Sequence, residues 1–303
     1  MAAQLRAIRQ RISAIKSTAK ITRAQELIAS SRIIKAQQRM RAATPYANEI
    51  QRAMEAVVTR SESIDHPLVR QPGGAQRAAI LILTSDRGFA GGYNANVLRE
   101  AQRLRAMLEG QGIAVDTYVS GNKGIAWHRF RQRELAGQWS GFSEDPAPKN
   151  ATEITTALLE AFERPTADGG VDELHLVHTT FISMLSQRPS ARRMLPLEVE
   201  EVEGEPAAGA VPLYEFEPSP QAVLDALLPW YVENRIYYAL LESAAAEIAA
   251  RRRAMKSATD NANDLLDQFT REANKARQAE ITQEISEIVG GANALAESIA
   301  GSK

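Results

Sequence analysis

The chain has 303 residues and nearly balanced charge, with 36 Lys/Arg against 37 Asp/Glu, and it has no cysteine. The absence of cysteine excludes a disulfide framework, thiolate metal sites and cysteine nucleophiles, and it suits a reducing compartment. No apolar run approaches the roughly 18 residues that cross a bilayer, and no apolar stretch follows the basic N-terminus as in a signal peptide. We therefore expect a cytoplasmic protein that meets a membrane only through a partner.

Charge is unevenly distributed along the chain. Residues 1–58 carry eleven Lys/Arg against three Asp/Glu, whereas residues 142–217 carry five against fifteen. A basic segment is typical of contact with nucleic acid or with an acidic protein surface. Nucleic-acid binders usually interleave aromatic side chains for stacking, and Tyr46 is the only aromatic residue of this segment. The pattern favours a solvated face or an acidic protein partner over nucleic acid.

Residues 3–58 have the pattern of one long helix. Apolar side chains recur at spacings of three and four, which places them on one stripe as a heptad seam. The seam begins at Leu5, Ile8, Ile12, Ile15 and Ala19. We expect it to slip near Ile21 and to resume around Leu27, Ser31 and Ile34. Thr44-Pro45 is expected to end or kink the helix before the pattern resumes.

Residues 76–205 have the pattern of a globular α/β domain, after a Pro/Gly-rich linker. The continuous apolar run at residues 78–84 predicts a strand buried on both faces. Strands are also expected at residues 113–119, 173–182 and 194–202, with helices at 94–108, 122–131 and 152–162 and loops at 164–170 and 203–209. Strands that alternate with helices predict a small, Rossmann-like, three-layer domain with a mostly parallel sheet.

From Pro220 the chain again reads as one long helix. Its middle, residues 244–258, is rich in alanine, and its end carries a strict seam. That seam comprises Ile281, Ile285, Ile288, Ala292, Leu295 and Ile299. The alanine-rich middle has little apolar area to bury, so we expect an outside partner to surround it and the helix to be marginally ordered alone.

The expected layout is helix, domain, helix: an N-terminal coiled-coil helix over residues 1–60, the α/β domain over residues 76–205 and a C-terminal coiled-coil helix over residues 215–303. Neither seam can be buried by its own helix. The economical arrangement is a long antiparallel coiled coil with the α/β domain at its base and both chain termini together at the far tip.

Phosphate-binding motifs are missing. The chain has no G-x-x-x-x-G-K-[ST] loop and no G-x-G-x-x-G fingerprint. The turn from Ser85 to Asn94 is glycine-rich, follows the first strand and opens a helix, so its amides could cradle an anion. It lacks a lysine at its end, and a tight turn in which Asn94 caps the helix is favoured. The turn from Gly121 to Gly124 is read in the same way. We expect no nucleotide and no cofactor.

Metal ligands are not grouped either. His175 and His178 lie three apart on an expected strand, hence on opposite faces, and ordinary core or surface histidines are favoured. The acidic residues Glu198, Glu200, Glu201, Glu203 and Glu205 read as an exposed strand end. No metal site and no catalytic residue is predicted.

Three stretches resemble the gamma subunit of the F-type ATP synthases. They are residues 8–32, the turn at residues 85–94, and residues 254–292, which include Ile281-Thr282-Gln283-Glu284 and Glu287-Ile288-Val289-Gly290-Gly291-Ala292. The last is the most specific. Together they span both ends and the middle of the sequence, so the resemblance covers essentially the whole chain. Several of these stretches, and the loop at residues 164–170, are more similar to actinobacterial members.

The resemblance implies a non-catalytic rotor shaft. In the family the terminal helices form a coiled coil inside a ring of alpha and beta subunits, and the base binds the epsilon subunit and the c-subunit ring. The family's shaft transmits torque for proton-coupled ATP synthesis, so the resemblance places this chain at the cytoplasmic face of the plasma membrane, as a peripheral protein held through the c ring. The loop at residues 164–170 would tune hydrolysis.

The resemblance also implies contact residues. Glu247 and Arg251 match positions that meet a beta-subunit loop, although residue chemistry alone favours a solvated helix face there. Arg277 and Gln278 match an upper beta-subunit contact. The seam residues Ile281, Ile285, Ile288 and Leu295 would serve the coiled coil and an apical bearing.

Two other functions remain open from the residues alone. An enzyme built on the α/β domain would bind nucleotide or a small substrate as an isolated chain. A coiled-coil adaptor or nucleic-acid scaffold would dimerise through its seams or bind nucleic acid in a salt-sensitive way.

Overall fold

A computed structural model describes residues 2–60, 74–197 and 220–300. The chain forms two compact units, one of residues 1–28 with 253–303 and one of residues 29–252. The helices α1 (Ala2–Arg60) and α5 (Pro220–Ala300) each contribute a stretch to both units. Within the described ranges, no helix is both long and apolar enough to span a membrane.

The larger unit is built on a five-stranded sheet in the order β3-β2-β1-β4-β5. Three neighbouring pairs, β1 with β2, β1 with β4 and β2 with β3, are parallel, and β5 is antiparallel to β4. The strands are β1 (Arg77–Leu83), β2 (Ala114–Ser120), β3 (Gly137–Trp139), β4 (Glu173–Phe181) and β5 (Gln187–Leu195). The expected mostly parallel α/β sheet is thus confirmed.

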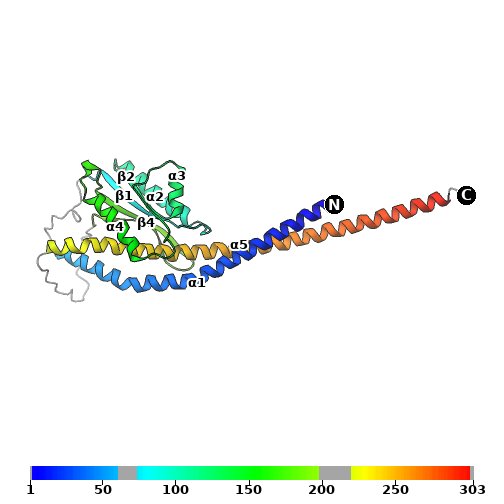
Figure 1. Cartoon of the computed structure of the whole chain (residues 1–303), viewed down its shortest axis with the longest axis horizontal. Coiled ribbons are helices and arrows are strands. Elements are labelled where there is room, and N and C mark those ends of the chain that lie inside the picture. Colours follow the sequence, from blue (N-terminus) through cyan, green and yellow to red (C-terminus); the bar gives the residue numbers. More distant parts are fainter. Residues whose placement is uncertain (1, 61–73, 198–219, 301–303) are drawn as a thin grey trace, which may run out of the picture. The chain divides into compact units, whose positions relative to one another are not determined.

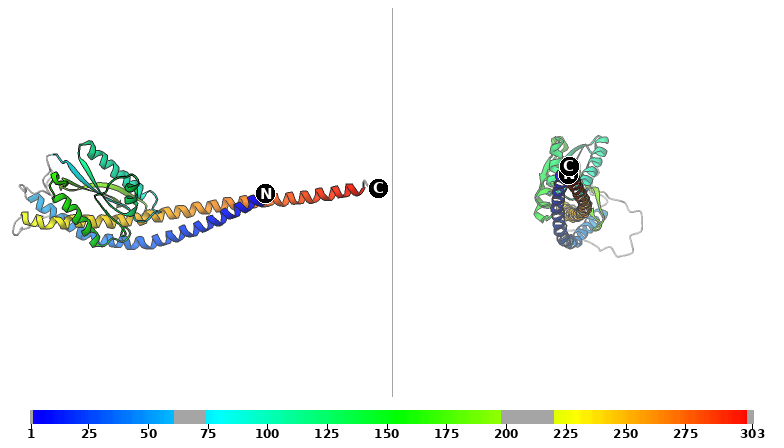
Figure 2. Two further views of the ribbon diagram at one scale, coloured as in Figure 1. Left: turned by 45° about the horizontal axis from the view of Figure 1, so that its top comes forward. Right: turned by 90° about the vertical axis from the view of Figure 1, so that its right-hand side faces the viewer.

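Helices cover both faces of this sheet, which makes three layers (Figures 1 and 2). The alternate residues Ala78, Ile80 and Ile82 of β1 pack against α2 (Tyr93–Gly110) and α3 (Asn122–Phe130). Ala79, Leu81 and Leu83 pack on the other side. There they meet α4 (Pro148–Glu163) and the stretches of α1 and α5 that belong to this unit. Coverage of both faces explains why β1 is apolar from Ala78 to Leu83.

The alanine-rich middle of α5 is buried within the larger unit. Ala245 and Ala249 are fully covered and pack with Ala29 and Ile33 of α1. Ala246 is also fully covered and packs in a cluster with Tyr93 of α2. The expectation that an outside partner must cover this stretch was therefore wrong for residues 244–250, because small side chains let other parts of the chain approach α5 closely.

In the smaller unit the two helices run antiparallel. Thr22 Oγ1 lies 2.8 Å from Thr259 Oγ1, and the guanidinium of Arg11 lies 5.9 Å from the ring centre of Phe269. This register places the start of α1 opposite about residue 279, and α5 continues past it (Figure 1). The expectation that both termini lie together was therefore wrong.

The seam of α1 follows a different register from the expected one. Leu5 and Ile8 are buried and Ile12 and Ile15 are half-buried, as expected. Beyond them there is no slip: the buried positions are Thr22, Glu26, Ala29, Ile33 and Ala36, whereas Ile21, Leu27, Ser31 and Ile34 are exposed. Polar side chains can occupy the seam because they find partners: Thr22 contacts Thr259 and Glu26 accepts a 2.8 Å hydrogen bond from Arg23.

Pro45 does not end α1, which runs on to Arg60. A proline removes one backbone donor and costs most where water cannot replace the lost hydrogen bond. Pro45 lies on the exposed side of the helix, so the cost is reduced.

Two strands differ from expectation. The strand expected at residues 194–202 lies at Gln187–Leu195 instead, and the part of the expectation beyond residue 197 falls outside the described residues, as does the loop at 203–209. The short strand β3 was not expected. Both lie at sheet edges, where few side chains are buried, so neither has a strong apolar pattern. The loop at residues 164–170 contains a short 3₁₀ turn, Thr166–Asp168.

Ile154 on α4 is fully buried in the core between the sheet and α4. Its substitution tests how much this core contributes to stability. We expect Ile154→Ala to lower the free energy of unfolding by about 2–5 kcal/mol, because it removes buried methyl groups and leaves a cavity. Denaturant unfolding of the full chain measures this. Ile182→Ala is the matched control, since Ile182 is 59% exposed; equal losses in the two variants would contradict the assigned core.

Candidate functional site at the carboxyl edge of the sheet

Asn94 holds the turn after β1 in place and does not cap α2. The backbone N–H of Ser85 donates to Asn94 Oδ1 at 2.9 Å, and Asn94 Nδ2 donates to Ser85 Oγ at 2.7 Å. The residue before α2 is Gly92, which has no capping side chain. The expectation that Asn94 caps the helix was wrong, because its side chain points back to the start of the turn.

Asp86, in this turn, occupies a place where an anion could bind. Its carboxylate accepts hydrogen bonds from the backbone N–H groups of Asn122 at 3.0 Å, Gly141 at 2.8 Å and Ser143 at 3.0 Å. Ligands of open α/β sheets bind at this carboxyl edge, where amides favour negative charge. Here the chain's own carboxylate takes up those amides and ties together the loops that follow β1, β2 and β3.

Arg251 of α5 is buried against the same edge. Its guanidinium donates to Glu247 at 2.6 Å and to Glu144 at 2.8 Å, and to the carbonyl oxygens of Gly88 at 3.2 Å and Arg87 at 3.4 Å. Its side chain is 8% exposed, and that of Glu247 is 1% exposed. The alternative of a solvated helix face is therefore wrong for both residues.

The carboxylate of Glu247 is buried and only half of it is hydrogen-bonded. One carboxylate oxygen accepts from Arg251, and the other, Oε2, is buried without a hydrogen-bond partner. Burial raises the pKa of Glu247 to about 7; Arg251 opposes this rise and the nearby Glu144 adds to it. Tyr93 packs beside the cluster, and burial together with the charge of Glu247 raises the pKa of its phenol.

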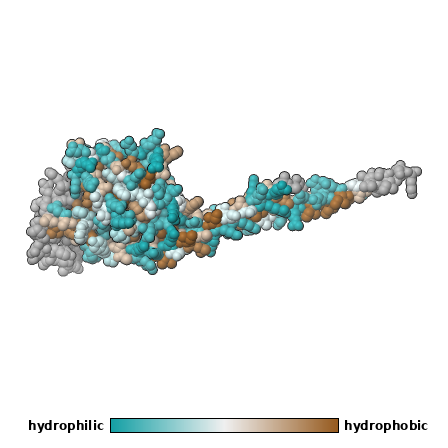
Figure 3. Space-filling view, viewed as in Figure 1, coloured by the Kyte–Doolittle hydropathy of each residue, from teal (hydrophilic) through white to brown (hydrophobic). Residues whose placement is uncertain are grey.

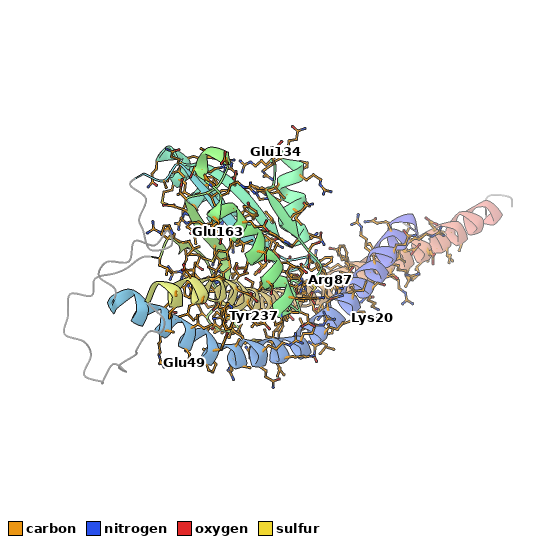
Figure 4. All side chains as sticks on the ribbon, turned by 60° about the vertical axis from the view of Figure 1, so that its left-hand side comes forward. Lys20, Glu49, Arg87, Glu134, Glu163 and Tyr237 are labelled. Atoms are coloured by element: carbon orange, nitrogen blue, oxygen red, sulfur yellow. The ribbon has the colours of Figure 1, made fainter. Side chains whose placement is uncertain are left out.

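The stretch of α1 in this unit faces the same edge with basic side chains. Arg32 pairs with Glu144, and Arg39 pairs with Asp145. An open cavity of about 560 Å³ lies here, and Lys35 and Arg87 also line it. Figure 4 shows Arg87 on the side of the domain where α5 passes.

Sequence reasoning singled out the turn that holds Asp86 but missed Glu144 and Arg32. Glu144 follows β3, a strand too short to be recognised, so nothing indicated that its loop returns to α1 and α5. Arg32 belongs to a helix with many exposed cations, and its spacing does not distinguish it from them.

The contact residues expected farther along α5 lie in the smaller unit. Arg277 and Gln278 are exposed. Ile281, Ile285 and Ile288 are 44%, 56% and 71% exposed, so they do not form a seam with α1. With Val289 they make an exposed apolar stripe on α5, visible in Figure 3. The side chain of Leu295 lies outside the described residues.

The histidines in the described part of the chain, His128, His175 and His178, are buried. His175 and His178 are buried, and each lies within hydrogen-bond distance of a carboxylate, Glu173 at 2.8 Å and Glu242 at 3.0 Å respectively. The ring of His128 contacts the carbonyl oxygen of Gly124 at 2.9 Å. Among the described residues no group of three or more His, Cys, Asp or Glu could hold a metal. The acidic residues 198–205 fall outside that part of the chain.

The raised pKa of Glu247 predicts a pH dependence of stability. The folded chain holds this proton up to about pH 7, while the unfolded carboxyl releases it near its ordinary pKa of 4.5. Stability from this group is therefore full below about pH 4.5 and is lost as pH rises through about 7, by up to about 1.4 kcal/mol per pH unit. Glu247→Gln should remove that loss.

Denaturant unfolding at several pH values measures this contribution of Glu247 to stability. We expect the stability of the unchanged chain relative to Glu247→Gln to fall between pH 5 and pH 7. Glu163→Gln changes an exposed glutamate and should show no such trend. If the unchanged chain instead gains stability relative to Glu247→Gln as pH rises, the attraction of Arg251 outweighs burial and the pKa of Glu247 is not raised.

Comparison with known proteins gives the family. A family model described as ATP synthase matches residues 4–295. The chain is 59% identical to the ATP synthase gamma chain of Acidothermus cellulolyticus, over 97% of this chain and 98% of that protein. It is 58% identical to the ATP synthase gamma chain of Thermobifida fusca, over the whole of both.

Solved structures show the same fold. One is a chain of the Euglena gracilis mitochondrial ATP synthase, described as OSCP/F1/c-ring, with a TM-score of 0.69 at 16% identity over 97% of this chain and 95% of that chain. Another belongs to the central stalk and c-ring of the Tetrahymena thermophila enzyme, with a TM-score of 0.56 at 20% identity over 78% of this chain and 99% of that chain. Together with the full-length curated relatives, these findings show that the chain belongs to the ATP synthase gamma chain family.

Proposed function

We propose that this chain is the central shaft of a rotary ATP synthase and transmits torque between a proton-driven ring and catalytic beta subunits. The observation that carries the proposal is the exposed apolar stripe of α5, which continues past the start of α1. Water-exposed isoleucines at helical spacing on an otherwise charged helix call for an apolar partner. An apolar sleeve at the top of a ring of alpha and beta subunits provides one.

The shaft acts by contacting the states of the beta subunits unequally. A protein can shift the equilibrium of a partner only through a difference in its contacts with the partner's states. An asymmetric shaft supplies that difference as it turns, because each beta subunit meets a different face in succession. The chemistry of ATP synthesis stays in the beta subunits, and Asp86 fills the anion position of this chain's own α/β sheet.

The partners follow from this role. The solved relatives are described as central stalk with c-ring and as OSCP/F1/c-ring. For this chain we propose alpha and beta subunits around the helices, and the epsilon subunit and the c-subunit ring at the α/β domain. The chain would lie at the cytoplasmic face of the plasma membrane as a peripheral protein held through the c ring.

Arg277 and Gln278 are the proposed upper contacts with a beta-subunit loop, and their exposure leaves them available. Glu247 and Arg251 are proposed as lower contacts, but their side chains are already engaged by Glu144 and the turn after β1. A beta-subunit loop would therefore meet the small exposed part of Arg251.

Assembly is the decisive test of the shaft. The chain is tagged and co-expressed with alpha and beta subunits from a close relative, and the purified complex is assayed for ATP hydrolysis. We expect a stable, ATP-hydrolysing complex only when this chain is present. A chain that stays alone, or that binds nucleotide by itself, would overturn the proposal.

Charge reversal tests the upper contact. Arg277→Glu should lower the rate of ATP hydrolysis by the assembled complex, because a lost charged hydrogen bond at a buried contact costs about 1.5–3 kcal/mol. Arg271→Glu is the control, since it makes the same change at another exposed position of α5. Equal rates for the two variants would remove Arg277 from the proposed contact.

A further inference from the structure

Glu144 connects the two long helices to one loop of the α/β domain. One carboxylate oxygen pairs with Arg32 of α1, and the other accepts a 2.8 Å hydrogen bond from Arg251 of α5. The side chains of Glu144 and Arg251 are 17% and 8% exposed, so water screens their contact weakly, whereas that of Arg32 is 51% exposed. A single carboxylate therefore bridges segments that are more than two hundred residues apart in the sequence.

The loop that carries Glu144 is itself held in place. Asp86 accepts the N–H of Ser143, the residue before Glu144, and the N–H of Asp86 donates to Ser143 Oγ at 2.9 Å. The same carboxylate fixes Gly141 and the start of α3 at Asn122. The position of Glu144 is thus set by the carboxyl ends of three strands and not by a free loop.

Each arm of this arrangement has a second contact. On α1, Arg39 pairs with Asp145. On α5, Arg251 also binds the carbonyl oxygens of Gly88 and Arg87 in the turn after β1. We call the set Asp86, Glu144, Arg32 and Arg251 the Glu144 joint.

The apolar packing around the joint constrains the rotation of the helices less sharply than directed hydrogen bonds do. Apolar contact is non-directional, and in this cluster α5 contributes the small side chains of Ala245 and Ala249 beside the larger Ile248. Charged hydrogen bonds between an arginine and a carboxylate have defined geometry and so fix an angle as well as a distance. The joint adds such directional contacts at this edge of the sheet to those that α5 makes elsewhere, such as the 3.0 Å contact between Glu242 and His178 of β4.

We propose that Glu144 is a positioning residue for rotary coupling: it locks α1 and α5 to the carboxyl edge of the sheet, so that a turn of the α/β domain turns both helices together. The inference rests on the proposed shaft function. Without the carboxylate charge the helices stay packed by their apolar contacts but slip under load, so hydrolysis of ATP proceeds while less of it is converted into proton transport.

The test uses the complete ATP synthase in inverted membrane vesicles. The rate of ATP hydrolysis and the rate of ATP-driven proton pumping are measured on the same vesicles, and their ratio reports coupling. Glu144→Gln keeps the shape of the side chain and removes its charge. We expect ATP hydrolysis within twofold of the unchanged enzyme and a pumping-to-hydrolysis ratio lower by about tenfold, the factor at the lower end of the range for one charged hydrogen bond.

Arg32→Gln provides a second variant, because Arg32 is half exposed and its loss is less disruptive to folding. It should lower the same ratio, and the double variant should be little worse than Glu144→Gln alone, since both changes break one contact. Glu163→Gln and Arg41→Gln are the matched controls, because both residues are exposed. Figure 4 shows Glu163 on α4, apart from Arg87, whose carbonyl oxygen contacts Arg251.

The outcomes separate the joint from the shaft. Unchanged coupling in both Glu144→Gln and Arg32→Gln overturns the joint. If Glu144→Gln fails to assemble while Arg32→Gln assembles and couples normally, Glu144 serves folding only and the joint is again overturned. Failure of the unchanged chain and of the controls to assemble overturns the proposed shaft function instead.

Discussion

The close approach of α5 to its neighbours is the constraint on which the rest of the structure depends. Ala245, Ala246 and Ala249 are fully covered, and each has only a methyl group to place between helix and neighbour. That allows α1 on one side and Tyr93 of α2 on the other to contact α5 directly. The following turn of the helix then lies near enough to the sheet for Arg251 to reach two backbone carbonyls of the turn after β1.

The charges at that edge are not explained by stability. Burying an ion pair costs desolvation energy that the attraction within the pair often fails to repay. Glu247 shows the cost, because one of its oxygens is unpartnered and burial raises its pKa to about 7. Replacing a buried ion pair by an apolar contact of the same volume often leaves stability unchanged or raises it. We therefore attribute the cluster to orientation: two carboxylates and two carbonyl oxygens fix the position of Arg251 and constrain the rotation of α5 about its axis.

Periodicity predicted the helices, the buried strand β1 and the mostly parallel sheet, because each buries a large apolar face with a regular repeat. Periodicity failed where buried positions are polar and apolar side chains are exposed. Thr22 and Glu26 are buried in the seam while Ile21 and Ile34 are exposed, since a side chain's neighbours across the helix pair, and not its hydrophobicity, decide its position there. The candidate site was harder still, because Asp86 and Glu144 act through loops whose meeting depends on strand order.

Asp86 shows how a ligand-binding edge becomes a structural one. The carboxyl ends of parallel strands gather unpaired amides, and in enzymes of this architecture a phosphate commonly satisfies them. In this chain a carboxylate two residues after the buried Thr84 accepts from three of them. A bound phosphate could come and go, whereas a covalently attached carboxylate holds the loops permanently. Permanent closure suits a part that bears load in every turn, and fold alone would not have indicated it.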